Sequence, residues 1–280
     1  MQNPLSILIT GCSTGIGYQV AKDLHFNTDY RVIASARSAE DVARLNAQGL
    51  YCVQLDLQDS DSIKSAFEQT LEHTGGELYG LFNNGAYGQP GAVEDLSRGM
   101  LREQFETNVF GTMELTNLAI RVMRKQNSGR ILFNSSVLGF VALTLRGAYN
   151  ASKYALEGFA DTLRLELTDT GIDISLIEPG PVATNFRSNS HAMYIKTLKG
   201  KPSVFTAAYQ ANEARLAKAG PAAPLTLPAS AVTPKVMHAL DSKRPKARYY
   251  VTVPTYFMAY LKRILTHKAM DKVLLKISQN

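Results

Sequence analysis

A tyrosine and a lysine stand four residues apart in the stretch Tyr149-Asn150-Ala151-Ser152-Lys153. On a helix, residues at i and i+4 lie on one face, so Tyr149 and Lys153 can point together. A free tyrosine has a pKa of about 10 and is a poor acid–base catalyst near neutral pH. A nearby ammonium favours the phenolate and lowers that pKa, which suits the pair to proton transfer. The same spacing is common on solvated helix faces, so this interpretation needs support from other residues.

A glycine-rich turn lies near the start of the chain, between an apolar run at residues 5–9 and a helical pattern at residues 17–24. Glycines allow a tight turn and a close backbone approach to a pyrophosphate, and the following helix offers amide donors and a positive dipole end. Such a turn also occurs without a ligand, but its place in the first strand–turn–helix unit favours dinucleotide binding. The turn reads Thr10-Gly11-Cys12-Ser13-Thr14-Gly15-Ile16-Gly17.

The end of the second predicted strand bears on the choice between NAD and NADP. A carboxylate there would bind a ribose 2′-hydroxyl and repel a 2′-phosphate. This strand ends Ala34-Ser35-Ala36-Arg37-Ser38, with an arginine and no carboxylate. A guanidinium suits phosphate oxygens, so we expect NADP (NADPH), with added hydroxyl contacts from Ser13, Thr14 or Ser38. The alternative is that Arg37 is an ordinary surface arginine.

Apolar runs alternate with helical patterns along most of the chain. Strands are predicted at residues 5–9, 30–36, 51–55, 78–82, 130–133, 173–177 and 248–253, and helices at residues 17–24, 39–48, 62–71, 100–123, 149–167, 207–219 and 230–240. Buried strands separated by helices are typical of a parallel sheet covered on both faces. We therefore expect residues 1–280 to form a single α/β domain with a C-terminal extension, a doubly wound parallel sheet (Rossmann fold) in three α/β/α layers.

Several motifs in a fixed order are more specific than any one of them. Ser136 ends a predicted strand and precedes Tyr149 by thirteen residues. From Thr10 to Thr184, the chain resembles the single-domain short-chain dehydrogenases/reductases. The matching residues are Thr10-Gly11, Gly15-Ile16-Gly17, Leu55-Asp56-Leu57, Asn83-Asn84, Asn108, Ser136, Tyr149, Lys153 and Pro179-Gly180-Pro181-Val182-Ala183-Thr184.

The resemblance implies an oxidoreductase that moves a hydride between NADP(H) and a carbonyl or alcohol. It makes Tyr149 the proton donor for reduction, or the base for oxidation, and has Ser136 hold the substrate oxygen. Lys153 would grip the nicotinamide ribose and lower the pKa of Tyr149, and Asn108 would anchor a water that links Lys153 to solvent. In such chemistry the protein supplies positioning and one proton.

The resemblance also implies which residues hold the cofactor. Asp56 would touch the adenine ring, Asn83 would lie beside the adenine ribose, and Val182 and Thr184 would hold the carboxamide. The expected cofactor-binding residues are Gly11, Ser13, Thr14, Gly15, Ile16, Gly17, Arg37, Asp56, Leu57, Asn83, Tyr149, Lys153, Pro179, Val182 and Thr184. No metal site is expected.

One departure from the family pattern is visible. The family usually has Asn-Asn-Ala-Gly after the fourth strand, whereas this chain has Asn83-Asn84-Gly85-Ala86, for which we expect small backbone changes and retained cofactor binding. Two alternatives have other functions. A cofactor-binding regulator or scaffold without turnover would be expected to lack Tyr149 or Lys153. The extended epimerases and dehydratases usually have a differently spaced glycine motif and a longer substrate domain.

The substrate side of the sequence is largely apolar. Residues 137–148 contain only Thr144 and Arg146 as strongly polar side chains, and with Phe186 and Met193 they would line a hydrophobic pocket, or simply pack in the core. Arg146 could reach a polar end of the ligand. Residues 186–230 form a predicted substrate-side lid. The stretch 227–252 resembles the steroid and retinol dehydrogenase branch, and bacterial aldehyde reductases share the pattern, so a hydrophobic aldehyde, ketone, steroid or retinoid-like substrate is expected.

The positive charge is concentrated at the C-terminal end of the chain. Of a formal net charge of +6, residues 235–280 contribute ten Lys or Arg against two Asp. No nucleic-acid-reading motif accompanies them, so no nucleic-acid partner is expected. Residues 254–280 are predicted as a basic amphipathic helix, which would contact an anionic membrane or pack on its own domain or a partner subunit. A homo-oligomer is compatible with either interpretation.

The remaining composition bears on location. Two cysteines are too few for a disulfide framework, and no apolar run reaches the length of a membrane span. The first residues lack the basic region of a secretory signal. These features predict a cytoplasmic protein, with membrane association at most peripheral.

Overall fold

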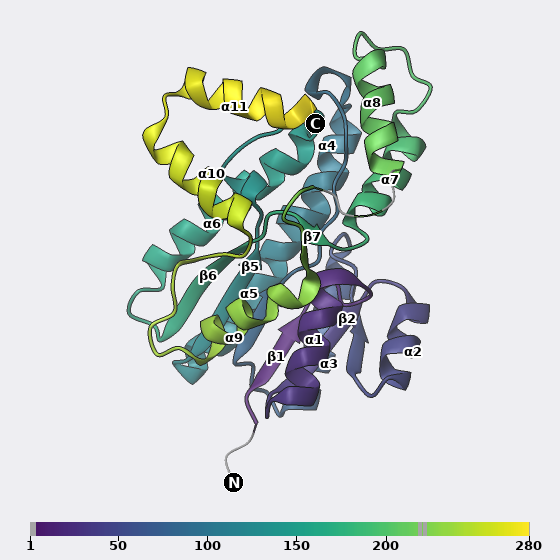
Figure 1. The fold of residues 1–280 in the computed structure, drawn as a ribbon. Coiled ribbons are helices and arrows are strands. Elements are labelled where there is room, and N and C mark those ends of the chain that lie inside the picture. Colours follow the sequence, from purple (N-terminus) through teal and green to yellow (C-terminus); the bar gives the residue numbers. More distant parts are fainter. Residues whose placement is uncertain (1–3, 218–219, 221–222, 280) are drawn as a thin grey trace.

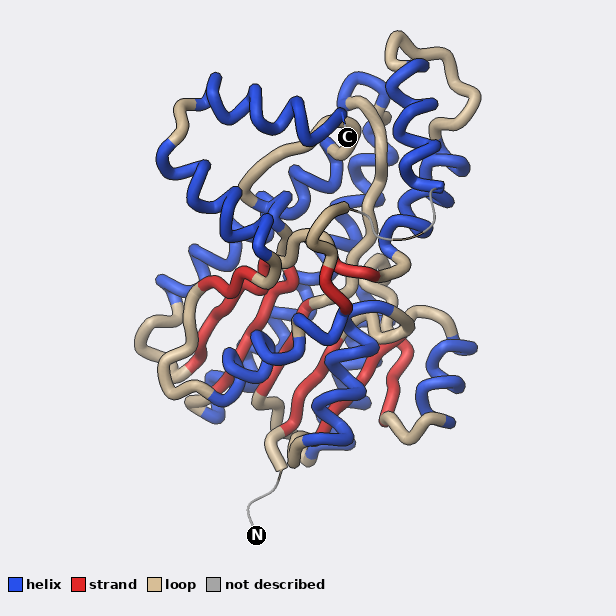
Figure 2. Tube along the Cα trace, viewed as in Figure 1, coloured by secondary structure: helices blue, strands red, loops and turns tan. Residues whose placement is uncertain are grey.

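The core of the fold is one sheet of seven parallel strands. A computed structural model describes residues 4–217, 220 and 223–279. The strands are β1 (Ser6–Ile9), β2 (Arg31–Ala36), β3 (Tyr51–Gln54), β4 (Gly80–Asn83), β5 (Gly129–Asn134), β6 (Ile172–Glu178) and β9 (Arg248–Tyr250). They lie in the order β3-β2-β1-β4-β5-β6-β9, all parallel. Figure 2 draws the strands in red. The chain adds strands to one side of β1 as far as β3 and then to its other side from β4 onward. Doubly wound folds bind their ligands at this switch point, between β1 and β4.

Helices cover both faces of this sheet (Figure 1). Helices α1, α2 and α9 pack on one face, and α3, α5 and α6 on the other. Along β1, Leu8 belongs to one core cluster and Ile7 and Ile9 to the other, because successive side chains of a strand point to opposite faces. The predicted three-layer Rossmann fold is therefore confirmed. The bounds are α1 (Gly15–Asn27), α2 (Ala39–Ala47), α3 (Ser60–Thr74), α5 (Gly111–Gln126), α6 (Gly147–Glu166) and α9 (Thr233–Asp241).

The single helix predicted over residues 100–123 is helical throughout in the structure, but it contains a π-helical turn that was not predicted. The structure has α4 (Arg98–Phe105), a π-helical turn η2 (Glu106–Phe110) and then α5. The Thr112 hydroxyl donates a 3.3 Å hydrogen bond to the Thr107 carbonyl oxygen, five residues earlier. One wider turn scarcely changes the spacing of the apolar residues. The sequence pattern therefore does not reveal the π-helical turn. Such turns recur at functional sites, and this one carries Asn108.

A helical segment follows β6 at the edge where the strands end. It contains α7 (Phe186–Thr197) and α8 (Thr206–Ala217), whose Tyr194 and Tyr209 rings lie 5.6 Å apart. Only one helix, at 207–219, was predicted here, and its residues 218 and 219 lie outside the described chain. Helix α7 was not predicted because it has almost no apolar stripe. Strand β7 (Val182–Ala183) pairs with β8 (Leu227–Pro228), which joins the two ends of the segment.

Two further expectations need correction near the end of the chain. The predicted helix 230–240 begins later, as α9, because a 3-10 turn, η4 (Ala229–Ala231), precedes it and Ser230 does not cap it. The predicted strand 248–253 ends with β9, since Pro254 in the first turn of the next helix suits a helix start.

The C-terminal extension is two helices instead of the one predicted over residues 254–280. Helices α10 (Val253–Ile264) and α11 (His267–Gln279) meet at Leu265, whose backbone is extended. Their inner faces, through Met258 and Met270, pack with Leu138 and Val141. The tail therefore lies on its own domain, over the loop that precedes Tyr149. No helix in the described part of the chain is long and apolar enough to cross a membrane.

Candidate active site

The glycine turn at the end of β1 is shaped as a cradle. Gly11 and Gly15 have φ of +69° and +64°, a region that favours glycine. A Cβ on Gly11 would lie 2.7 Å from the Gly85 Cα, and one on Gly17 would lie 2.4 Å from the Asn84 side-chain nitrogen. Thr14 precedes α1 without a side-chain cap, which leaves the first amides of the helix for an anionic ligand. These features fit the pyrophosphate of a dinucleotide.

Hydrogen bonds from the end of β4 hold this cradle. The Asn84 and Gly85 amides donate to the Thr10 hydroxyl over 2.9 Å and 2.8 Å. The Asn84 side chain donates to the Thr10 and Gly11 carbonyl oxygens over 2.9 Å and 3.2 Å. In the altered Asn-Asn-Gly-Ala order, Gly85 thus stands where its backbone closely approaches that of Gly11. Asn84 was not among the expected site residues, although its position in the motif could have identified it.

The end of β2 presents Arg37 beside the cradle. The Arg37 side chain is exposed, and within the described residues it forms no hydrogen bond or ion pair. The Ser38 hydroxyl is engaged by Asp41 at the start of α2. Arg44, which no sequence signal singled out, donates a 2.8 Å hydrogen bond to the Ser13 carbonyl oxygen and pairs with Asp41 at 2.6 Å.

Asp56 and Asn83, the residues expected beside the adenosine, differ in burial and in side-chain direction. Asp56 is half-buried, and its carboxylate accepts a 3.0 Å hydrogen bond from the Gln58 amide. Asn83 is buried and donates a 2.9 Å hydrogen bond to the Thr116 hydroxyl of α5. Its side chain is therefore turned into the helix layer, and only its backbone is left to face a ribose. Leu57 is buried and its carbonyl lies against Gly111, where a Cβ would come within 1.8 Å.

The acid–base residues meet at the start of α6. Tyr149 and Lys153 lie one turn apart, with the ammonium 5.7 Å from the centre of the tyrosine ring. Lys153 donates a 2.6 Å hydrogen bond to the Asn134 carbonyl oxygen at the end of β5. Ser136, two residues further, accepts from the Leu138 amide at 3.1 Å, and its hydroxyl acts on the Tyr149 hydroxyl, whose pKa it lowers. The four predicted catalytic residues include this triad.

Burial sets the ionisation of the pair. It raises the pKa of Tyr149 to about 12, against the opposing effect of the Ser136 hydrogen bond. It lowers the pKa of Lys153 to about 8, and the negative charge of Glu157 only partly offsets this. At neutral pH the tyrosine is thus a neutral proton donor beside a cationic lysine.

The fourth predicted residue, Asn108, joins three segments. Its side-chain amide donates to the Tyr87 carbonyl oxygen at 3.0 Å and accepts from the Tyr87 amide at 3.1 Å. It also donates to the Ser152 hydroxyl at 3.1 Å, on the turn of α6 that carries Lys153. The π-helical turn gives Asn108 this position between α4, α5 and α6.

Residues 179–184 return to the site after β6. The Pro179 carbonyl oxygen accepts a 2.8 Å hydrogen bond from Val137, next to Ser136. Val182 pairs with Leu227, and the Thr184 side chain lies 3.3 Å from where a Cβ on Gly15 would be. The segment expected to hold the carboxamide therefore lies between the glycine turn and Ser136.

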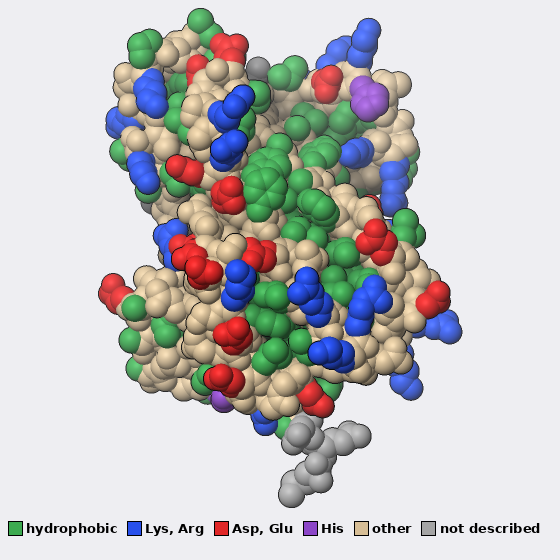
Figure 3. Space-filling view, turned by 180° about the vertical axis from the view of Figure 1, so that it is seen from behind, with side chains coloured by type: hydrophobic (Ala, Val, Ile, Leu, Met, Phe, Trp, Pro, Cys, Tyr) green, Lys and Arg blue, Asp and Glu red, His purple; other side chains and the backbone are tan. Residues whose placement is uncertain are grey.

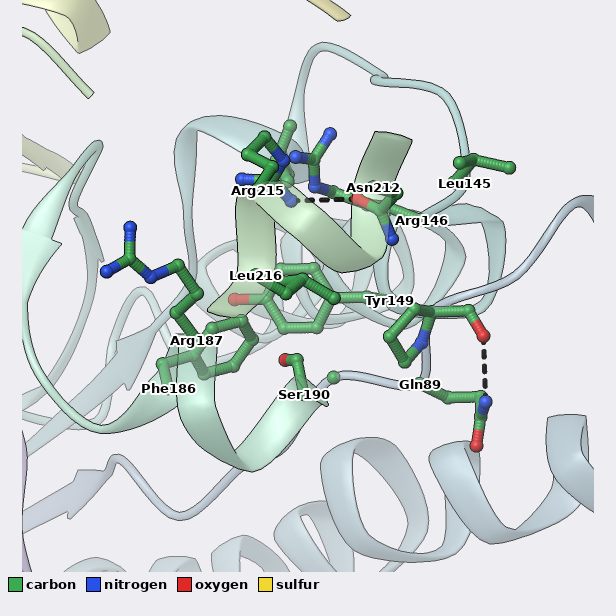
Figure 4. A pocket seen from close by; sticks show the side chains of 13 residues that line it. Gln89, Leu145, Arg146, Tyr149, Phe186, Arg187, Ser190, Asn212, Arg215 and Leu216 are labelled. Carbon is green, nitrogen blue, oxygen red and sulfur yellow. Dashed lines mark hydrogen bonds between the residues drawn. The ribbon is translucent and has the colours of Figure 1, made fainter. Parts of the chain in front are cut away.

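A cavity of about 140 Å³ opens beside Tyr149. Figure 4 shows Tyr149, Phe186 and Ser190 on one side and Arg146, Asn212 and Arg215 across from them. The Phe186 ring lies 5.1 Å from the Tyr149 ring. Met193, the other residue expected to line the pocket, does not line this cavity. The lining residues are Gly88, Gln89, Pro90, Leu138, Leu145, Arg146, Tyr149, Phe186, Arg187, Ser190, Asn212, Arg215 and Leu216.

Comparison with known proteins agrees with this geometry. A family model described as short chain dehydrogenase matches residues 6–195. The chain belongs to the short-chain dehydrogenase/reductase family. The Escherichia coli protein named uncharacterized oxidoreductase YbbO is 40% identical over 96% of this chain and 93% of its own length. Human retinol dehydrogenase 8 is 36% identical over 65% of this chain and 60% of its own length.

The same comparison extends to solved structures. A short chain dehydrogenase/reductase from Burkholderia phymatum, solved in complex with NAD, matches with a TM-score of 0.78 and 22% identity over 98% of this chain and 97% of that one. This likeness concerns the fold. Family membership makes the chain an oxidoreductase that acts on an alcohol or carbonyl group and binds a nicotinamide dinucleotide.

A partly buried ionic cluster is linked to this family site through Ser135. Arg248 on β9 pairs with Glu178 at 2.6 Å, with Asp161 at 2.8 Å and with Glu157. Glu157 in turn accepts a hydrogen bond from Ser135, the neighbour of Ser136. Burial raises the pKa of Glu178 to about 8, and the charge of Glu157 adds to this. The cluster joins residues far apart in the chain, so no sequence pattern indicated it.

Proposed function

We propose that this protein is an NADP(H)-dependent reductase of hydrophobic carbonyl compounds, able to oxidise the matching alcohols. The observation that carries the proposal is the meeting of Ser136, Tyr149 and Lys153 at the start of α6, with a cavity beside Tyr149. The bound cofactor supplies the hydride. Every other step falls to side chains of this chain.

The proton step belongs to Tyr149. Its hydroxyl, neutral at pH 7, would donate a proton to the carbonyl oxygen, while Ser136 donates a hydrogen bond to the same oxygen. Lys153 would stabilise the tyrosinate that results, and would be held to the cofactor ribose. Asn108 would hold a water that reconnects Lys153 with solvent. In the oxidation direction the same groups would act in reverse, with Tyr149 as the base.

The remaining site residues would bind the cofactor. Gly11 to Gly17, with the first amides of α1, would hold the pyrophosphate. Asp56, Leu57 and the Asn83 backbone would border the adenosine, and Pro179, Val182 and Thr184 the nicotinamide. Arg37, exposed and without a side-chain partner within the described residues, would receive the 2′-phosphate, which favours NADP over NAD.

The substrate class follows from the cavity. Leu138, Leu145, Phe186 and Leu216 supply apolar walls, which favour hydrocarbon chains or rings over small polar carbonyls. Retinol dehydrogenase 8, to which this chain is similar, is named for a substrate of that kind. Helices α7 and α8, which carry Phe186 and Leu216, would form the lid over it.

The test is a reduction assay with NADPH across carbonyls of increasing hydrophobicity. Straight-chain aldehydes, ketosteroids and retinal should be turned over faster than short hydroxy acids or sugars. A screen in which the small polar compounds lead would contradict the proposed substrate class. If no carbonyl or alcohol were turned over while NADPH still bound, the alternative of a cofactor-binding regulator would replace an enzyme.

A second surface bears on the proposed partners. Seen from the face opposite to Figure 1, hydrophobic side chains gather along the middle of the molecule (Figure 3). Helix α6, on the α3–α5–α6 side of the sheet, exposes Tyr154, Phe159 and Leu165. This apolar surface supports the proposal of a homo-oligomer, which light scattering at increasing protein concentration would test.

A further inference from the structure

Two arginines stand in the cavity wall across from Tyr149. Arg146 immediately precedes α6, and Arg215 lies in the last turn of α8. Both side chains are half-buried, and the lining between them and Tyr149 is largely apolar. A third arginine of the lining, Arg187, donates a 2.7 Å hydrogen bond to the Gly220 carbonyl oxygen.

Neither Arg146 nor Arg215 has an acidic partner in the described part of the chain. Arg215 donates to the Asn212 side-chain oxygen at 3.0 Å, and Arg146 donates to the Thr144 carbonyl oxygen at 3.4 Å. Two acidic residues of this region are engaged elsewhere. Glu213 pairs with Lys199 at 2.6 Å, and Asp95 accepts from Ser203 and Tyr209.

Without a bound anion, these two half-buried arginines destabilise the folded protein. Burial and the charge of Arg215 lower the pKa of Arg146 to about 10, and burial and the charge of Arg187 lower the pKa of Arg215. Cations gathered in an apolar wall without a counter-charge are destabilising unless a partner arrives. A carboxylate or a phosphate would be such a partner, because its oxygens match the fork of a guanidinium.

We propose that the substrate is an amphipathic carbonyl compound with an anionic group at its far end, held by Arg146 and Arg215. Its carbonyl reacts at Tyr149 and its apolar middle lies along Leu138 and Leu216. The inference rests on the proposed reductase function and narrows it. A purely hydrocarbon aldehyde would fill the apolar wall but leave both cations uncompensated.

The probes are aldehydes that carry a carboxylate at the other end, from five to twelve carbons long, each compared with its methyl ester. Acid and ester share the reacting group and nearly the same length, and only the acid is charged. At the best chain length, kcat/KM with NADPH should favour the acid by about tenfold or more, the scale of a charge-assisted contact, mainly through KM. Arg215→Gln should lower this acid-to-ester ratio by about threefold, part of the charge-assisted contact, and the double variant with Arg146→Gln should bring it to about one.

Lys196→Gln is the matched control, because it removes one positive charge from an exposed position of α7 outside the cavity lining. It should leave the acid-to-ester ratio unchanged. If the native enzyme reduces both probes and prefers the ester at every length, the proposal is overturned while the reductase function stands. An equal fall of the ratio in Lys196→Gln would also overturn it, since general charge would then explain the preference.

A binding measurement separates this proposal from the reductase function. Calorimetry on the NADP-saturated protein would compare decanoate with decanamide, neither of which can be reduced at a carbonyl by hydride transfer here. Decanoate should bind about tenfold more tightly or better, Arg215→Gln should reduce the difference, and the double variant with Arg146→Gln should remove it. Equal binding of the two would overturn the anion site. This arm decides the question even if no carbonyl is turned over and the proposed function fails.

Discussion

The Lys153 ammonium lies 5.7 Å from the centre of the Tyr149 ring and donates its 2.6 Å hydrogen bond to the Asn134 carbonyl oxygen. A strand end and a helix start are thus joined through one side chain. The lysine is held beside the tyrosine before any ligand arrives, so little reorganisation is needed for it to stabilise the tyrosinate.

Replacing Tyr149 with Phe tests the proton donor. The ring and its contact with Phe186 are kept, and only the hydroxyl is lost. We expect kcat for carbonyl reduction to fall by at least about a hundredfold, the usual scale for a general acid. The Kd for NADPH, measured by fluorescence titration, should change little. Turnover close to the native rate would remove Tyr149 from this role.

The pH dependence tests the lysine. Since Lys153 loses its proton with a pKa of about 8, while Tyr149 stays protonated to about 12, kcat/KM for reduction should be level below pH 8 and fall above it. The fall should come from the lost charge beside the tyrosine. A profile that stays level to pH 10 would contradict this assignment.

The same lysine affects stability with the opposite sign. Its pKa is about 8 when folded against 10.5 for the free side chain, so the unfolded state binds more protons between these values. The cost of the buried charge is present below pH 8, and stability should rise with pH across that window. Lys153→Met removes the charge and loses one hydrogen bond, so we expect it to raise the free energy of unfolding at pH 7 by about 1–2 kcal/mol while abolishing activity. Urea denaturation at pH 7 and pH 10 measures both effects.

Cofactor choice is tested at the end of β2. We expect the native ratio of kcat/KM for NADPH to that for NADH to be about ten to a hundred, from a charge-assisted contact of Arg37 with the 2′-phosphate. Arg37→Ala should lower the ratio, and Ala36→Asp should move it toward NADH by repelling that phosphate. Arg124→Ala, an exposed arginine on α5, is the control. A native ratio at or below one would mean that Arg37 has no part in recognition.

The glycine cradle is tested by a matched pair of substitutions. Gly11 and Gly75 have φ of +69° and +73°, so alanine is strained by about 1 kcal/mol at either position. Only at Gly11 does the new Cβ meet another backbone, at 2.7 Å from Gly85. Gly75→Ala should therefore destabilise modestly and leave the Kd for NADPH unchanged, whereas Gly11→Ala should weaken cofactor binding about tenfold or more. Similar Kd values in both variants would argue against the cradle.

The outer face of the tail is tested with vesicles. Tyr256, Phe257 and Tyr260 are exposed on α10, and Lys268 and Lys272 are exposed on α11. If this face contacts anionic lipid, the protein should sediment with phosphatidylserine vesicles at low salt and be released by added salt. The variant Lys268→Glu/Lys272→Glu should bind less. No sedimentation at low salt would leave packing on the domain as the role of the tail.

Much of the site could be predicted from local patterns. The glycine turn, the Tyr149–Lys153 spacing and the alternation of apolar runs with helices each depend on residues close together in the chain. Turn geometry, helix periodicity and burial on both faces of a strand are local properties. They determined the Rossmann fold, the family and the order of the site residues.

The tertiary structure decided what depends on contacts between distant residues. It turned Asn83 toward Thr116, brought Arg44 to Ser13, and placed Arg215 across the cavity from Tyr149. It also divided the predicted helices at η2 and at Leu265. The direction of a side chain and the end of a helix depend on which neighbours pack against them. The spacing of apolar residues along a helix does not identify those neighbours. For that reason the sequence by itself indicated the catalytic pair Tyr149 and Lys153. Only the folded chain showed that Arg146 and Arg215 line the cavity beside Tyr149 and have no acidic partner among the described residues.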